Sequence, residues 1–159
     1  MKRSTRILLI AVIVLVCLIC LSNAAYILIQ GGGMAGLYGV NMELAQWNQE
    51  VLGLQRFIFW GWLTAGLVFD ALLAVFMIRS LLAVRSGILF PKANTFLLMA
   101  ASAVNLVYNI CHSNIGIVLH SERLFTIDNA DLLLPLILLA FSLIYGIAVR
   151  ISEENQMTI

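Results

Sequence analysis

Charge is what this sequence has least of. Only 11% of its 159 residues are charged, nine Lys or Arg and eight Asp or Glu, whereas about 25% is usual for a soluble domain. Such a chain cannot cover itself with polar surface, which excludes the soluble globular and disordered classes. A formal net charge of +1 also leaves no basic patch for direct nucleic-acid binding. Two prolines and 11 glycines exclude a fibrous chain. What remains is 62% hydrophobic and indicates an integral membrane protein whose first partner is the lipid bilayer.

Four apolar segments are each about long enough to cross the membrane. A helix rising about 1.5 Å per residue needs roughly 20 apolar residues to span ~30 Å of hydrocarbon. None of the segments alternates like the strands of a barrel. The sequence therefore predicts an all-α, integral membrane four-helix bundle formed by one domain, residues 1–159. Its helices are expected at about 7–29, 57–78, 96–119 and 132–149.

The first apolar segment has a competing interpretation as a secretory signal peptide. Basic residues precede it, and Ser22-Asn23-Ala24 resembles a small-residue cleavage site. The apolar run continues to Ile29, however, which gives a full spanning length. We interpret it as an uncleaved membrane helix.

The distribution of Lys and Arg predicts the orientation. Cytoplasmic loops carry an excess of these residues, and seven of the nine fall on one side of the four segments, with only Arg56 and Arg123 on the other. Both termini, including the tail 150–159, are therefore expected in the cytoplasm. The seven are Lys2, Arg3, Arg6, Arg79, Arg85, Lys92 and Arg150.

Two features of the first outer connection carry predictions. The run Gly31-Gly32-Gly33 is expected to form a flexible turn, since it lacks the strand and the Lys-Ser/Thr of a phosphate-binding loop. In residues 40–54, apolar side chains recur at spacings of four and three, which is typical of an amphipathic helix. We expect a short helix there, lying on the outer surface or capping the bundle. Its apolar positions are Val40, Leu44, Trp47, Val51 and Leu54.

Neither the cysteines nor the second outer loop predicts an active centre. Cys17 and Cys20 form a Cys-x-x-Cys within the first helix, but they lie at mid-depth among apolar residues, which disfavours a thiol redox pair. We interpret these two cysteines, and Cys111 beside His112, as buried apolar side chains. The loop residues with metal-binding groups match no known metal spacing and are expected to be solvated. We therefore expect no cofactor, no metal and no enzymatic activity. These loop residues are His120, Glu122, Asp128 and Asp131.

Asp70 is the one ionisable acid within a predicted span, and a charge there costs roughly 2.5–3.5 kcal/mol on insertion scales. A polar stripe on the third helix lies at a matching depth, and we expect an Asp70–Asn105 hydrogen bond, extended by Ser142 or Tyr145 of the fourth helix. This intramembrane polar cluster has two interpretations, structural contacts between helices or a protonatable, ligand-binding site. The stripe consists of Ser102, Asn105, Asn109, His112 and Gly116.

Two stretches resemble the DUF2975 family of small bacterial four-helix membrane proteins. One is Gly87-Ile-Leu-Phe90-Pro-Lys-Ala-Asn94 before the third helix, and the other is the acidic tail ending in Met157-Thr158-Ile159. The resemblance implies a multi-pass protein of the bacterial cytoplasmic membrane, and it implies no catalytic residues. It implies a cytoplasmic regulatory protein as partner, because family members are often encoded beside a short helix-turn-helix regulator. The expected partner surface is Phe90, Asn94, Glu153, Glu154, Thr158 and Ile159; the alternative is that Phe90 anchors a turn and the tail is disordered.

Two functions are compatible with the sequence. The first is a non-enzymatic membrane protein that is regulatory or binds a partner through its cytoplasmic loop and tail. The second is a small transporter or channel with a protonatable Asp70, which would require a homo-oligomer because four helices enclose little volume.

Overall fold

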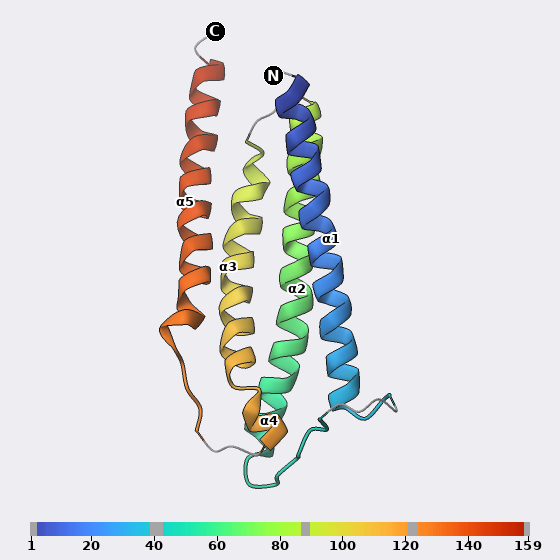
Figure 1. Ribbon diagram of the computed structural model, residues 1–159. Coiled ribbons are helices and arrows are strands. Elements are labelled where there is room, and N and C mark those ends of the chain that lie inside the picture. Colours follow the sequence, from blue (N-terminus) through green and yellow to red (C-terminus); the bar gives the residue numbers. More distant parts are fainter. Residues whose placement is uncertain (1–2, 39–42, 87–89, 121–123, 158–159) are drawn as a thin grey trace.

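The computed structural model describes residues 3–38, 43–86, 90–120 and 124–157, and within these ranges it contains helices and no strand. The helices are α1 (Arg3–Met34), α2 (Leu52–Arg85), α3 (Lys92–Ser113), the short α4 (Gly116–His120) and α5 (Asn129–Met157) (Figure 1). Four stretches are long and apolar enough to cross a membrane: Ile7–Met34, Leu52–Val84, Lys92–His120 and Asn129–Glu154. The predicted all-α architecture with four spanning helices is confirmed.

α1, α2 and α5 extend beyond their predicted segments at both ends, whereas α3 begins four residues early, at Lys92, and ends early, at Ser113. The third predicted helix is also divided. α3 ends at Ser113, and Nδ2 of Asn114 donates hydrogen bonds to the carbonyl oxygens of Ile110 at 2.8 Å and Thr126 at 2.6 Å. A side chain that bonds to nearby backbone in this way competes with the helical ladder. The chain turns at Asn114 and resumes as α4.

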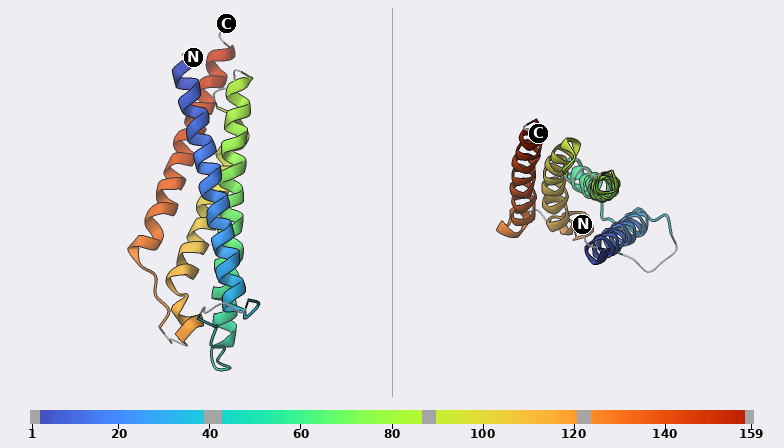
Figure 2. Two further views of the ribbon diagram at one scale, coloured as in Figure 1. Left: turned by 45° about the vertical axis from the view of Figure 1, so that its right-hand side comes forward. Right: turned by 90° about the horizontal axis from the view of Figure 1, so that it is seen from above.

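The four long helices form an open arc. α2 packs against α1 and α3, and α3 packs in turn against α5. Figure 1 shows the order α1, α2, α3, α5, and the view from above in Figure 2 shows α1 and α5 at the two ends of the arc. α1 begins and α5 ends at the same end of the molecule, and α4 lies at the other. Each outer helix therefore has one long helical neighbour.

Glycine allows α1 and α3 to approach α2 closely. A Cβ atom added at Gly66 would lie 2.7 Å from Cδ1 of Ile27 on α1 and 2.9 Å from Cε2 of Tyr108 on α3. Small residues at helix interfaces are what permit such close packing within membranes. The apolar core lies between Gly66 and the α4 end and contains Ile27, Ile58, Phe59, Trp62, Cys111, Ile117 and Val118.

The structure corrects the prediction of a turn at Gly31-Gly32-Gly33. All three residues are buried and helical within α1, and the turn follows at Ala35 and Gly36, where φ is +72°. A Cβ at Gly31 would lie 2.6 Å from Cδ1 of Leu63, and one at Gly32 would overlap the ring of Tyr38. These two glycines therefore serve close packing, and flexibility is not their role.

The predicted amphipathic helix over 40–54 is also wrong. Residues 43–48 have no regular structure, 49–51 form a turn, and helix begins only at Leu52 as part of α2; residues 40–42 lie outside the described ranges. The segment bonds to other parts of the molecule instead, because the amide N–H groups of Ala45 and Gln46 donate to the carbonyl oxygens of Met34 and Val118. Tertiary partners thus replace the local helical ladder.

Gln55 anchors this segment. Its side chain is fully buried, and its Oε1 accepts from the Asn48 amide at 2.8 Å. Its Nε2 donates to the carbonyl oxygens of Gln46 at 2.7 Å and Ile117 at 2.9 Å. A single amide from α2 therefore joins the outer segment to α4.

Candidate functional site

Asp70 pairs with α1. Its side chain is 6% exposed, and Nδ2 of Asn23 donates to its Oδ2 at 2.9 Å. The predicted Asp70–Asn105 bond is wrong, because the polar stripe of α3 makes its hydrogen bonds toward α5.

From sequence, Asn23 is predicted only as part of a cleavage-like tripeptide, with no partner inside the membrane. The signal that could have revealed it is simple. A buried acid needs a hydrogen-bonding partner, and Asn23 is an amide within an otherwise apolar spanning helix. Only the rotation of α1 about its axis decides that the amide meets Asp70.

The α3 stripe compensates for a proline in α5. Pro135 lies inside that helix and has no N–H, so the carbonyl of Asp131, four residues earlier, has no intrahelical donor. Nδ2 of Asn109 supplies the missing hydrogen bond at 3.1 Å. Oγ of Ser102 donates to the Pro135 carbonyl at 2.7 Å, and Asn109 also donates to Oδ1 of Asn105 at 3.4 Å. Of the two interpretations of the polar cluster, these hydrogen bonds match structural contacts between helices.

Asp131 itself organises the start of α5. Its Oδ2 accepts the Asp128 amide at 3.0 Å, and its Oδ1 accepts the hydroxyl of Ser113. An acid reaching back to the amide of the residue before the helix satisfies a free N-terminal donor, as in a capping box. Asp131 is therefore buried, and the prediction that it is a solvated loop residue is wrong.

The remaining members of the predicted cluster lie elsewhere. Ser142 donates to the carbonyl of Thr95 at 3.0 Å. His112 is exposed, and its ring stacks on that of Tyr108 with the centroids 5.7 Å apart. The hydroxyl of Tyr145 accepts from Nδ2 of Asn94 at 3.4 Å. The seven predicted residues thus form separate contacts and not a single site around Asp70.

Asn94 does not belong to the predicted partner surface, because its side chain lies in the interior. It is fully buried, and its Nδ2 donates to Oγ of Ser80 at 2.8 Å. Phe90 stands beside it, 38% exposed, with its ring edge against Tyr145 and the centroids 5.5 Å apart. The residue that precedes α3 is Pro91, and no side chain caps the helix. Asn94 therefore fastens α3 to α2 and α5.

Glu153 and Glu154, in contrast, lie on the surface. Both are exposed on the last turns of α5, and Glu153 lies 3.9 Å from Nζ of Lys92. With 82% of the lysine and 48% of the glutamate side chain exposed, such a pair contributes little to stability. Thr158 and Ile159 lie outside the described residues.

The groups that could carry redox or metal chemistry are dispersed. Cys17, Cys20 and Cys111 are free thiols. Nowhere in the described ranges do three His, Cys, Asp or Glu side chains gather in an arrangement that could hold a metal ion. Of the other loop residues that were expected to be solvated, His120 is exposed and lies 3.8 Å from Glu43, and Glu122 is outside the described residues.

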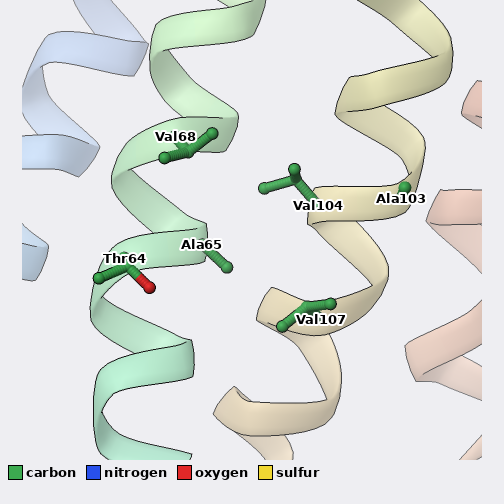
Figure 3. Close-up of a pocket in the computed structure, with 6 residues that line it drawn as sticks. All are labelled: Thr64, Ala65, Val68, Ala103, Val104 and Val107. Atoms are coloured by element: carbon green, nitrogen blue, oxygen red, sulfur yellow. The ribbon is translucent and has the colours of Figure 1, made fainter.

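One groove between α2 and α3 is apolar. It encloses about 330 Å³, and its only polar side chain, Thr64, donates to the carbonyl of Trp60 at 2.6 Å (Figure 3). With no free donor and no charge on its walls, this groove suits a hydrocarbon chain and no polar ligand. The lining residues are Thr64, Ala65, Val68, Ala103, Val104 and Val107.

No protein-family model, no curated protein and no solved structure matches this chain.

Proposed function

We propose that this multi-pass membrane protein is non-enzymatic and binds a cytoplasmic regulatory protein through the end of α5. The observation that carries the proposal is the length of that helix. α5 has 29 residues, about 43 Å of helix against a hydrocarbon thickness of ~30 Å. Its last turns therefore extend past the apolar layer as a continuous helix, where a partner can contact them.

The charges around this end support its assignment to the cytoplasm. Arg79, Lys92 and Arg150 lie at the end where α1 begins and α5 finishes, whereas Glu43 and Glu50 belong to the segment near α4. An excess of Lys and Arg marks the cytoplasmic side. The resemblance to DUF2975 implies a regulatory partner on the same side.

The proposed partner surface consists of Ile151, Glu153 and Glu154 of α5, together with Phe90, whose ring packs against Tyr145 of the same helix. Ile151 is 53% exposed and both acids are exposed. Ile151 is followed by two acids on the same helix, and this end of α5 therefore suits a partner with a basic, partly apolar face. Because these residues are already helical, binding requires little ordering of the chain.

The test is co-purification of the full-length protein from its native membrane with identification of the bound protein. We expect the double variant Glu153→Lys/Glu154→Lys, and a chain ending at Ser152, to lose a partner that wild type retains. The matched control is Glu43→Lys/Glu50→Lys, which reverses two exposed acids at the opposite end. Retention of the partner by the α5 variants, or its equal loss in the control, contradicts the proposal.

A second candidate function rests on the Asn23–Asp70 pair. An acid held by one neutral amide at the α1–α2 interface is the kind of group that relays protons in membrane carriers, and an oligomer would supply the missing walls of a path. Proton flux in liposomes that Asp70→Asn abolishes and Ser22→Ala preserves would support a transporter or channel. Equal flux in wild type and Asp70→Asn would exclude it.

A further inference from the structure

We propose that a groove between α3 and α5, at the end where α5 finishes, binds an anionic phospholipid. The groove encloses about 380 Å³ and is separate from the apolar groove between α2 and α3. Two cations, Lys92 and Arg150, stand on its walls, one from each helix, and one acid, Glu153 of α5, also lines it. Its apolar walls include Phe96, Met99 and Gly146. Glu153 belongs to both this groove and the proposed partner surface, but lipid binding is tested on the purified protein and does not require the partner.

The order of groups along the groove matches the order of groups in a phospholipid. Lys92 is the first residue of α3, so it lies where the spanning segment meets the headgroups. Phe96 and Met99 follow about 6 and 10 Å further into the apolar layer, at ~1.5 Å per residue. Phe96 is 71% exposed, so its ring is open to an acyl chain. When the lipid phosphate lies at the two cations, its acyl chain runs along Phe96 and Met99.

The two cations are available to a phosphate. Within the described ranges no ion pair joins Arg150 to an acid, and Lys92 meets Glu153 only at 3.9 Å with both side chains largely exposed. Such an exposed pair is weak, so a phosphate that approaches both cations competes with it. Basic pockets between spanning helices on the cytoplasmic side bind anionic headgroups for this reason.

Gly146 keeps the groove open. A Cβ there would already lie 3.3 Å from Cγ2 of Thr95 on the facing helix. A larger side chain at this position would fill the space between α3 and α5. The charge of the groove and its shape can therefore be tested separately, by substitutions of the two cations and of Gly146.

The experiment is native mass spectrometry of the purified full-length protein with phosphatidylglycerol or phosphatidylcholine added in detergent. We expect wild type to retain phosphatidylglycerol in preference to phosphatidylcholine. Lys92→Gln/Arg150→Gln should lower retention of the anionic lipid by at least about fivefold, since each cation near the headgroups contributes roughly that factor. Gly146→Leu should lower retention of both lipids. The matched control, Arg79→Gln, removes an exposed cation of α2 at the same end and should bind like wild type.

Several results would overturn the proposal. One is equal retention of the two lipids by wild type, and another is unchanged preference in the Lys92→Gln/Arg150→Gln variant. If soluble glycerophosphate displaces the lipid at an equal concentration, the acyl chain contributes nothing and the apolar half of the proposal is wrong. Helicity measured by circular dichroism identifies any variant that fails to fold. Lys92→Gln and Arg150→Gln alter exposed side chains only, so we expect this double variant to fold and to test the role of charge even if Gly146→Leu does not fold.

Discussion

Asn23 of α1 and Asp70 of α2 share a hydrogen bond of 2.9 Å, from Nδ2 to Oδ2. Within the part of the chain that the structure describes, it is the one side-chain hydrogen bond between α1 and another helix. α1 has no second long helix against which to pack. This pair therefore sets the rotation and depth of α1 against α2.

Replacing Asn23 with Leu should destabilise the protein. The change leaves the buried Asp70 without its described partner, and hydrogen bonds between membrane helices contribute about 0.6–2 kcal/mol. We expect a loss of that size in the free energy of unfolding, measured by titration with a denaturing detergent. Ser22→Leu, which alters the adjacent exposed residue, is the control. Adding Asp70→Leu to Asn23→Leu should recover stability, because removing both partners leaves no unsatisfied group; no recovery would count against the pairing.

Gly66→Leu should separate α2 from both of its neighbours. Even a Cβ at this position would lie 2.7 Å from Ile27 and 2.9 Å from Tyr108, and overpacking typically costs about 1–3 kcal/mol. The free energy of unfolding should fall by at least that amount. Gly53→Ala is a matched control in the same helix, since nothing lies within 4 Å of its added Cβ. The control should be neutral or slightly stabilising, and a similar loss in both variants would disprove the close approach at Gly66.

The contact between Asn109 and the Asp131 carbonyl should depend on Pro135. In wild type, Asn109→Leu leaves that carbonyl without a donor, which costs roughly 1–2 kcal/mol. Pro135→Ala restores a backbone N–H within α5, so the same Asn109→Leu change should cost clearly less in that background. The stabilities of the four proteins form a double-mutant cycle. Equal costs in the two backgrounds would show that Asn109 does not compensate for the proline.

Gln55→Leu should release the segment 43–51 from α4. The substitution removes three hydrogen bonds made by one buried amide and leaves their backbone partners unsatisfied, at about 1–3 kcal/mol for each buried group. We expect faster hydrogen exchange and faster proteolysis in residues 43–51. Gln49→Leu, at an exposed position in the same turn, should leave both rates unchanged. Unchanged rates in Gln55→Leu would contradict the anchoring role.

Where a prediction from the sequence is wrong, the cause is a contact between elements. The spacing of apolar residues over 40–54 reflects local helical periodicity alone, yet Gln55 and the carbonyls of Met34 and Val118 form the hydrogen bonds of that segment. Asn94, expected on the partner surface, is buried, and its Nδ2 donates to Ser80 and Tyr145. The DUF2975 resemblance, the orientation and the partner stay predictions.

The sequence by itself determined the four spanning helices, because apolar length and the shortage of charge are sums along the chain and need no knowledge of neighbours. It also identified Asp70 as an acid within the membrane that needs a hydrogen-bonding partner. Only the tertiary structure decided which residue satisfies it. That choice depends on the rotation of each helix about its axis and on the order of helices in the arc, which turns Asp70 toward Asn23 and turns the polar stripe of α3 toward the proline of α5.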